Sequence, residues 1–165
     1  MARWLDERGD QPQIVKGLYQ LHIDGGKKAS AAGEKGPGAY GFVLCDPRGT
    51  ELPGGAQGEV IGPVSDPHSA EYEALLAGLA LTRQLEIKYI AVFSDSRTLV
   101  NQVKGLWKSS AHLSEYREKA WNALSEFAGW QLSWIPRKWN ERADTLVDEA
   151  LATAAPGEEI KHAED

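Results

Sequence analysis

The feature that most constrains the fold is a change in hydrophobic period near residue 65. Before it, three apolar runs follow one another closely, over residues 17–25, 39–46 and 50–62, with turn-forming residues between them. After it, apolar residues recur at helical spacing over 69–85, and a further apolar run follows over 88–94. The pattern predicts an antiparallel meander with the third strand at its edge, joined through a crossover helix to a parallel strand.

The rest of the chain continues the alternation of helices and strands. Ser96 is placed to cap a short helix that ends near Lys104, and a second helix is predicted over 113–127. A strand over 130–135 stops at a proline, and the last helix starts near Asn140. This order indicates an α/β domain on a five-stranded mixed sheet, with three antiparallel strands, then parallel strands, and helices on both faces.

The length of 165 residues fits a single domain. We expect residues 17–154 to form it, after a loose leader over 1–16 and before a disordered acidic tail over 155–165. The charged N-terminus does not resemble a signal peptide, and no apolar run is long enough for a membrane span. The single cysteine, Cys45, fits a buried thiol in a reducing compartment. We therefore expect a cytoplasmic monomer with no membrane contact and no obligatory protein partner.

The charge is unevenly distributed along the chain. The net charge is −6, which by itself disfavours a nucleic-acid partner. Residues 83–142, however, carry ten basic and six acidic side chains, whereas residues 143–165 carry one basic and seven acidic. The middle of the chain can therefore present a positive face, although an ordinary mixed surface fits the same count.

Four acidic residues stand in settings that favour a common site. Asp24 and Asp95 each end an apolar run, while Glu71 and Asp144 lie near the starts of predicted helices. Because ligands of α/β sheets collect at the carboxyl ends of strands, we expect the four side chains to meet there. Each residue taken alone would also fit a turn or a helix cap. Glu73 competes with Glu71, but we expect it to face another side of the helix.

A cluster of carboxylates has a definite chemistry. Like charges raise each other's pKa, so four such groups cannot all ionise at one place without cations. Hard divalent cations prefer oxygen ligands, and a pair of them can promote in-line displacement at a phosphodiester. The cluster therefore predicts a site for two Mg²⁺ ions, with Mn²⁺ as a possible substitute.

The four acidic residues lie within longer segments that form a recognisable set. These segments are Asp24-Gly25-Gly26, Ala70-Glu71-Tyr72-Glu73-Ala74-Leu75, Ser94-Asp95-Ser96, Val100-Asn101-Gln102-Val103, Ile135-Pro136-Arg137 and Asn140-Glu141-Arg142-Ala143-Asp144. With them, the sequence resembles the type 1 ribonuclease H family, in particular its compact members without a long basic protrusion. The likeness covers residues 17–152 and includes the order of the elements.

The resemblance implies a partner and a role for each residue. The partner would be an RNA–DNA hybrid, whose RNA strand is hydrolysed to leave 5′-phosphate and 3′-hydroxyl ends. Asp24 would bridge both metal ions, Asp144 would hold the ion that activates water, and Glu71 and Asp95 would hold the other. Accessory residues expected to steady the leaving phosphate are Arg137 and Lys138. Residues expected to contact the substrate are Gly25, Gly26, His68, Ser69, Ser96, Arg97, Trp107 and Asn140.

Two segments depart from the family pattern. Asp66-Pro67-His68 stands where relatives commonly carry Thr-Asn-Asn, and the loop Pro136-Arg137-Lys138-Trp139 lacks the histidine that many relatives place there. The first departure supports a rival prediction, a noncatalytic hybrid-binding or protein-interaction module on the same fold. A second rival is a metal nuclease of this fold that acts on duplex RNA or junction DNA. The complete set of four carboxylates favours the ribonuclease H prediction.

Overall fold

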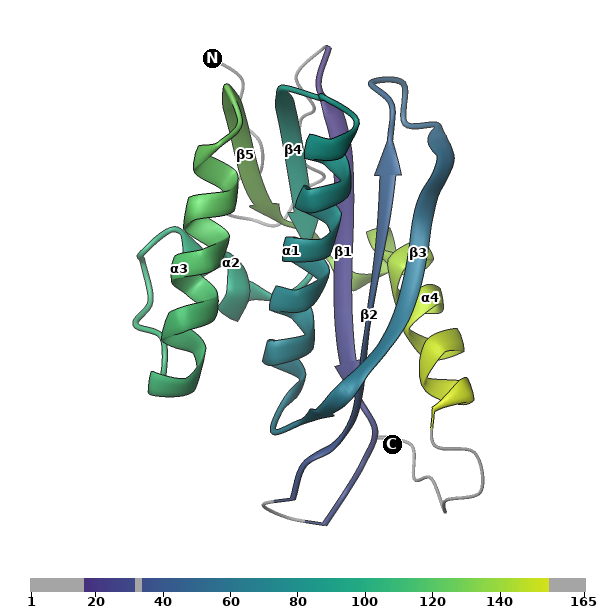
Figure 1. Cartoon of the computed structure of the whole chain (residues 1–165), viewed down its shortest axis with the longest axis vertical. Coiled ribbons are helices and arrows are strands. Elements are labelled where there is room, and N and C mark those ends of the chain that lie inside the picture. The colour runs from purple at the N-terminus through teal and green to yellow at the C-terminus, as the bar shows by residue number, and fades with distance from the viewer. Residues whose placement is uncertain (1–16, 32–33, 155–165) are drawn as a thin grey trace.

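A computed structural model describes residues 17–31 and 34–154, so the predicted leader and acidic tail lie outside the described residues. Within them, one five-stranded sheet has the strand order β3-β2-β1-β4-β5 (Figure 1). The strands are β1 (Tyr19–Lys27), β2 (Gly36–Cys45), β3 (Glu51–Val64), β4 (Tyr89–Ser94) and β5 (Gly129–Trp134).

The helices follow the predicted order. They are α1 (Pro67–Gln84), α2 (Arg97–Val103), α3 (Ala111–Ser125) and α4 (Glu141–Thr153), with the short 3-10 turn η1 (Arg137–Trp139) before α4. The main local difference lies in β3, which runs through Gly54 and Gly55 and ends at Val64, two residues beyond the predicted run. Gly54 takes a positive φ of 73°, a conformation open to glycine, so the strand turns there without ending.

Strand pairing confirms the predicted mixed sheet. β1 lies at its centre, where it pairs antiparallel with β2 and parallel with β4. β2 pairs antiparallel with β3, which leaves β3 at one edge, and β5 pairs parallel with β4 at the other. Five of the six residues of β4 are buried, as its almost continuous apolar sequence predicts for a strand covered on both faces.

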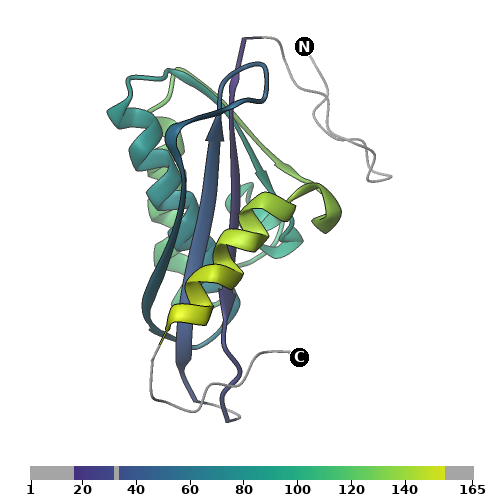
Figure 2. The same cartoon turned by 90° about the vertical axis from the view of Figure 1, so that its right-hand side faces the viewer.

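The sheet is covered on both faces. α1 and α3 lie over one face, and α4 crosses the other face and contacts β1, β2 and β3 (Figures 1 and 2). Because side chains alternate along a strand, Leu21 and Ile23 of β1 enter the main core with α1. His22 and Asp24 therefore point to the α4 face, where polar side chains gather.

Helix α1 has well-defined ends. Asp66 is its N-cap and accepts a hydrogen bond from the backbone N–H of Ser69 at 3.1 Å, and Pro67 occupies the first turn. At the other end, Glu86 has a φ of 63°, a conformation more common for glycine. The segment that departs from the family pattern is thus also the start of the helix that carries Glu71.

No helix among the described residues is long and apolar enough to cross a membrane.

Candidate active site

Two of the four carboxylates come from neighbouring parallel strands. Ile23 of β1 is aligned with Ser94 of β4, so the next residues, Asp24 and Asp95, stand side by side. Asp95 follows the last residue of β4, whereas β1 continues past Asp24 to Lys27 because it still pairs there with β2, so Asp24 does not end its strand as predicted. Asp24 is only 8% exposed. The register nevertheless brings the two carboxylates together, as predicted from the sequence.

Helix α1 brings Glu71 to the same place through a close approach to β1. A Cβ atom on Gly25 would lie 2.3 Å from the backbone nitrogen of Glu71, so only glycine allows the helix to come this near. The half-buried carboxylate of Glu71 is 3.1 Å from Nδ1 of His68, one turn earlier. This hydrogen bond raises the pKa of His68, although burial opposes the rise. Glu73 instead accepts a hydrogen bond from Tyr116 on α3, so it faces away from the cluster.

Asp144 reaches the site from the first turn of α4. Its backbone N–H donates to the carbonyl of Asn140 at 3.1 Å, which is the bond that opens the helix. Its carboxylate lies 3.6 Å from the guanidinium of Arg137, whose side chain is 79% exposed. Arg137 therefore places an exposed positive charge at the edge of the acidic cluster.

The carboxylates act on each other electrostatically. Burial, followed by the charge of Asp95, raises the pKa of Asp24 to about 9 from an ordinary 3.8, and a hydrogen bond and charge from Asp144 and the charge of Glu71 add to this. Asp24 is thus influenced by all three of the other acidic residues. Burial also raises the pKa of Asp95, while a hydrogen bond from Asn140 and the charge of Arg137 oppose the rise.

These residues suit a hard divalent cation. All four side chains offer oxygen ligands, and a cation would return Asp24 to its ionised form at neutral pH. Within the described ranges, no three His, Cys, Asp or Glu side chains are already arranged as a ligand set. The fit therefore rests on the chemistry of the four donors and on the raised pKa of Asp24.

The predicted substrate residues fall into two groups. The first group is buried and consists of Ser69, Ser96 and Asn140. Ser69 lies within the first turn of α1, and Asn140 precedes α4. Ser96 caps α2, because its hydroxyl accepts a hydrogen bond from the backbone N–H of Leu99 at 3.1 Å. A direct contact between the Asn140 side chain and a substrate conflicts with its 2% exposure.

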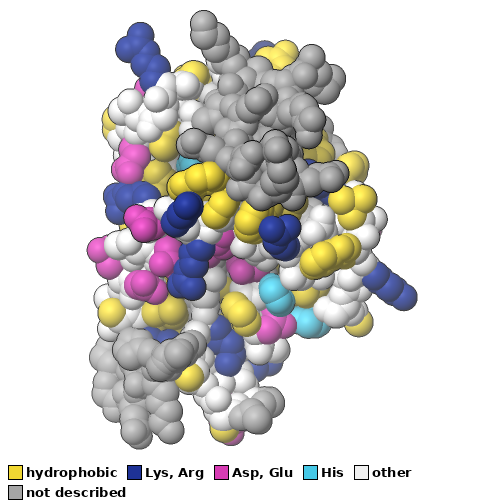
Figure 3. Space-filling view, turned by 180° about the vertical axis from the view of Figure 1, so that it is seen from behind, with side chains coloured by type: hydrophobic (Ala, Val, Ile, Leu, Met, Phe, Trp, Pro, Cys, Tyr) yellow, Lys and Arg dark blue, Asp and Glu magenta, His cyan; other side chains and the backbone are white. Residues whose placement is uncertain are grey.

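The second group lies at the surface. Trp107 is half exposed in the loop after α2, and Arg97 stacks its guanidinium over Trp134 at 3.8 Å. Lys138 lies near the ring of Trp139, at 5.4 Å. Acidic and basic side chains alternate over the face that α4 crosses (Figure 3). Gly26 is half buried on β1, so its backbone, like that of Gly25, remains a predicted contact.

One polar contact was missed by the sequence reasoning. Nε2 of His112, on α3, donates to the carboxylate of Asp66 at 2.6 Å, and its other ring nitrogen is 3.1 Å from the hydroxyl of Ser110. The two partners are 46 residues apart, and no local pattern marks them. This hydrogen bond links the first turn of α3 to the N-cap of α1, close to Glu71.

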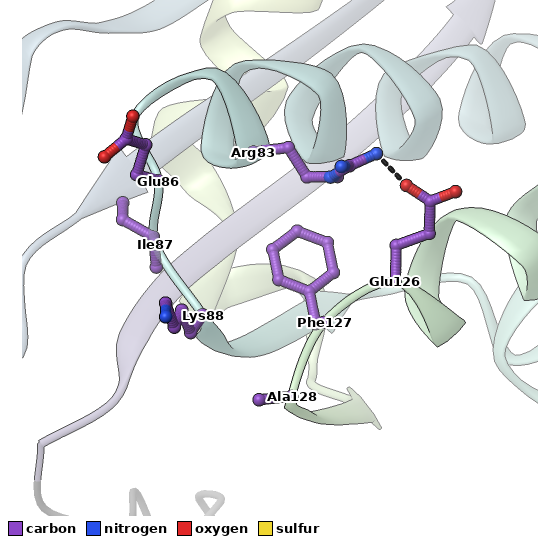
Figure 4. Close-up of a pocket in the computed structure, with 7 residues that line it drawn as sticks. All are labelled: Arg83, Glu86, Ile87, Lys88, Glu126, Phe127 and Ala128. Carbon is purple, nitrogen blue, oxygen red and sulfur yellow. Dashed lines mark ion pairs between the residues drawn. The ribbon is translucent and has the colours of Figure 1, made fainter.

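An open cavity is present at the opposite end of the strands. Its volume is about 600 Å³, and it lies beside the amino ends of β4 and β5, between the ends of α1 and α3 (Figure 4). An ion pair between Arg83 and Glu126 crosses one side of it. Because catalytic groups of α/β sheets lie at the carboxyl ends of strands, this cavity is not the candidate site.

Known proteins share both this fold and this sequence pattern. A family model described as reverse transcriptase-like matches residues 26–150. A ribonuclease HI of Halobacterium salinarum is 33% identical to this chain; the match covers 84% of this chain and 66% of that relative. A bifunctional protein of Mycobacterium tuberculosis is 31% identical, and the match covers 82% of this chain and 36% of that relative. The chain thus spans about two thirds or less of these curated relatives.

Solved structures of ribonucleases H1 share the fold of this chain. The crystal structure of ribonuclease H1 from Halobacterium salinarum superposes with a TM-score of 0.74 and 33% identity, covering 84% of this chain and all of that one. A ribonuclease H1 named LC11, solved in complex with an RNA/DNA hybrid, superposes with a TM-score of 0.71 and 30% sequence identity. The match covers 82% of this chain and 98% of that one.

Fold and site together define an α/β domain of the ribonuclease H type with an acidic centre. The chain belongs to the type 1 ribonuclease H family.

Proposed function

We propose that this protein is a divalent-metal-dependent endonuclease that hydrolyses the RNA strand of RNA–DNA hybrids, leaving 5′-phosphate and 3′-hydroxyl ends. The observation that carries the proposal is the meeting of four carboxylates from β1, α1, β4 and α4 around Asp24, whose pKa is raised to about 9. A buried acidic cluster of this kind destabilises the protein unless cations pair with it, so its presence favours a function that uses bound cations. The hybrid bound by the LC11 relative supports the same substrate here.

The four carboxylates would hold two Mg²⁺ ions, with Mn²⁺ as a substitute. Asp24, which interacts with the other three, would be shared between the ions, Asp144 would hold one of them, and Glu71 and Asp95 would hold the other. When bound, such ions lower the pKa of a water molecule and neutralise charge on the phosphate.

Other residues would orient the substrate. The guanidinium of Arg137, exposed beside Asp144, is placed to pair with a phosphate oxygen. A guanidinium stays protonated, so Arg137 would stabilise charge and not remove a proton. The backbone at Gly25 and Gly26, together with His68, would lie near the ribose, where 2′-hydroxyl groups distinguish RNA from DNA.

The test is cleavage of a hybrid with each strand labelled separately. We expect the native chain to cut only the RNA strand in Mg²⁺ and to stop when the metal is chelated. Asp95→Asn should lose at least about a hundredfold in rate, since it removes one charged ligand, whereas Glu118→Gln, exposed on α3, should match the native chain. Parallel reactions with duplex RNA, duplex DNA and a DNA junction test the rival substrates.

The possible outcomes separate the candidates. Binding of the hybrid without any cutting in Mg²⁺ or Mn²⁺ would indicate a noncatalytic module. Cutting of duplex RNA or a junction in preference to the hybrid would indicate a nuclease of the same fold with another substrate. The structure favours neither rival, because Asp66 is already engaged as a helix cap and by His112.

Two further expectations belong to this proposal. We propose a cytoplasmic location, supported by the free, buried thiol of Cys45, which cell fractionation would test. We also propose a monomer without an obligatory protein partner, which light scattering of the purified chain would test.

A further inference from the structure

Asn140 occupies a junction between the elements that carry three of the four carboxylates. It is 2% exposed, and its side-chain amide nitrogen lies 2.8 Å from the carbonyl oxygen of Ile23, the residue before Asp24. The same nitrogen lies 3.3 Å from Oδ2 of Asp95. Its own backbone carbonyl accepts from the N–H of Asp144 at 3.1 Å. One residue therefore contacts β1 beside Asp24, the carboxylate of Asp95 and the first turn of α4.

The chemistry of these partners determines how the amide is oriented. A carbonyl oxygen and a carboxylate are both acceptors, so the NH₂ group of Asn140 must face them and use both of its protons. Its amide oxygen, which points away, is buried and has no hydrogen-bond partner among the described residues. A buried unpaired acceptor costs free energy, which is a reason to look for a functional role at this position.

The side chain of Asp95 depends on this contact for its placement. Its backbone carbonyl accepts from Nε1 of Trp134 at 3.1 Å, so the main chain is held from β5. The hydrogen bond from Asn140 is the one described contact that orients its carboxylate. We expect loss of that bond to weaken the orientation of the Asp95 carboxylate toward Asp24.

We propose that Asn140 is a positioning residue that holds Asp24, Asp95 and Asp144 in one arrangement for the divalent ions, and that it does not contact the nucleic acid. This proposal rests on the proposed function and replaces the substrate contact predicted from the sequence. Groups that orient metal ligands from outside the ligand set change metal affinity or activity by about 10- to 100-fold when they are removed. The expected effect therefore falls on metal binding and on turnover.

Two substitutions test the role in different ways. Asn140→Asp keeps the size but replaces the two donor protons with acceptors, so it repels the oxygens of Ile23 and Asp95. Asn140→Ser keeps one donor in a smaller side chain. It is the milder change, so it still allows the test if Asn140→Asp does not fold. Asn122→Ser, on the exposed side of α3, is the matched control. Circular dichroism establishes that each variant is folded before the other measurements.

The first measurement is Mg²⁺ binding by titration calorimetry without nucleic acid. We expect Asn140→Ser to weaken Mg²⁺ binding about tenfold and Asn140→Asp to alter it at least as much, with no change for Asn122→Ser. In the Asp95→Asn background, Asn140→Ser should cause a smaller further loss than it causes alone, because part of its effect acts through the Asp95 carboxylate. Equal Mg²⁺ affinity in the native chain and both Asn140 variants would overturn the proposal.

The second measurement is binding of the hybrid with the metal chelated, followed by steady-state cleavage. A positioning role predicts a hybrid dissociation constant within about twofold of the native value and a fall in kcat of about tenfold or more. A hybrid affinity that falls more than tenfold, with Mg²⁺ binding intact, would show a direct substrate contact and sink the proposal. A native chain that binds Mg²⁺ but cuts no hybrid would contradict the proposed function alone, since the calorimetric comparison uses no hybrid.

Discussion

Asp24 is the residue at which stability and function are opposed. It is 8% exposed and surrounded by three other acidic side chains, so its charged form is disfavoured in the folded protein. In the unfolded chain, the same carboxyl ionises near its ordinary pKa. The metal-free protein therefore loses stability by keeping an aspartate there.

Asp24→Asn should stabilise the metal-free protein at neutral pH. The pKa of Asp24 rises from 3.8 to about 9 on folding, so between these values the native state holds a proton that the unfolded state has lost. Stability accordingly falls as the pH rises through this window. The substitution should gain on the order of 2 kcal/mol at pH 7 and little below pH 4, measured by urea unfolding in a chelator. A gain of the same size at both pH values would contradict this account, and Glu118→Gln serves as the surface control.

The pair between Asp66 and His112 should show the opposite pH dependence. Burial opposes ionisation of Asp66, but hydrogen bonds from His112 and from Ser69 outweigh it and lower the pKa of Asp66. Its contribution to stability is present above the ordinary pKa and is lost as the pH falls through the lowered one.

Removal of the imidazole in His112→Ala should move the Asp66 pKa back up, measured by carbon NMR of its carboxyl group. His112 is half exposed, so screening limits the loss of stability to less than about 1 kcal/mol. His112→Gln, which can still donate a hydrogen bond, should cause a smaller rise. An Asp66 titration unchanged in His112→Ala would mean that the contact is absent in solution.

At the scale of elements, the site depends on how α1 meets the sheet. The helix starts at a capping aspartate, passes within contact of Gly25, and ends at Glu86 in a left-handed conformation. Glu71 lies in its second turn, near the N-terminal end, whereas its last turn lies beside the cavity at the far end of the sheet. The two ends can therefore be changed independently.

Glu86→Gly should stabilise the protein without affecting the site. A φ of 63° is strained for glutamate but open to glycine, so the change should gain about 0.5–1 kcal/mol. Gln84→Gly, two residues earlier and still helical, should instead lose up to about 1 kcal/mol. Thermal unfolding of the three proteins checks the sign of each change. A loss of stability in Glu86→Gly would mean that the carboxylate of Glu86 makes a contact that outweighs the strain.

At the scale of the whole molecule, the four carboxylates come from elements spread over most of the folded chain. Any ligand that binds the native cluster and not the unfolded chain therefore stabilises the entire domain. The effect should grow with pH, because the ligand must displace the proton that Asp24 retains.

Mg²⁺ should raise the melting temperature of the native chain. At a hundred times its dissociation constant, a single bound ion would add about 2.7 kcal/mol. The double variant Asp24→Asn/Asp95→Asn should show almost no such gain, and sodium chloride of equal ionic strength controls for screening. An equal rise in the native and double-variant proteins would place the bound Mg²⁺ elsewhere.

The order of the elements and the four carboxylates could be predicted from sequence because their signals are local. Hydrophobic period distinguishes strand from helix within a few residues. An aspartate directly after an apolar run marks the strand end at Asp95 but not at Asp24, because β1 continues to Lys27. The pairing of Asp24 with Asp95 follows from the parallel register. The choice of Glu71 over Glu73 rests on the family resemblance and on the expectation that the two side chains face different sides of the helix.

Only the tertiary structure decided what surrounds these carboxylates. The sequence predicts Asn140 as a substrate contact at the start of the last helix, yet packing buries it against the backbone of Ile23, 117 residues away. The contact of His112 with Asp66 and the approach of α1 to Gly25 likewise join segments with no shared local pattern. Local sequence determines which residues are acidic and which segments form strands. Burial and the distances between charges, which set the pKa of Asp24, exist only once distant segments have packed together.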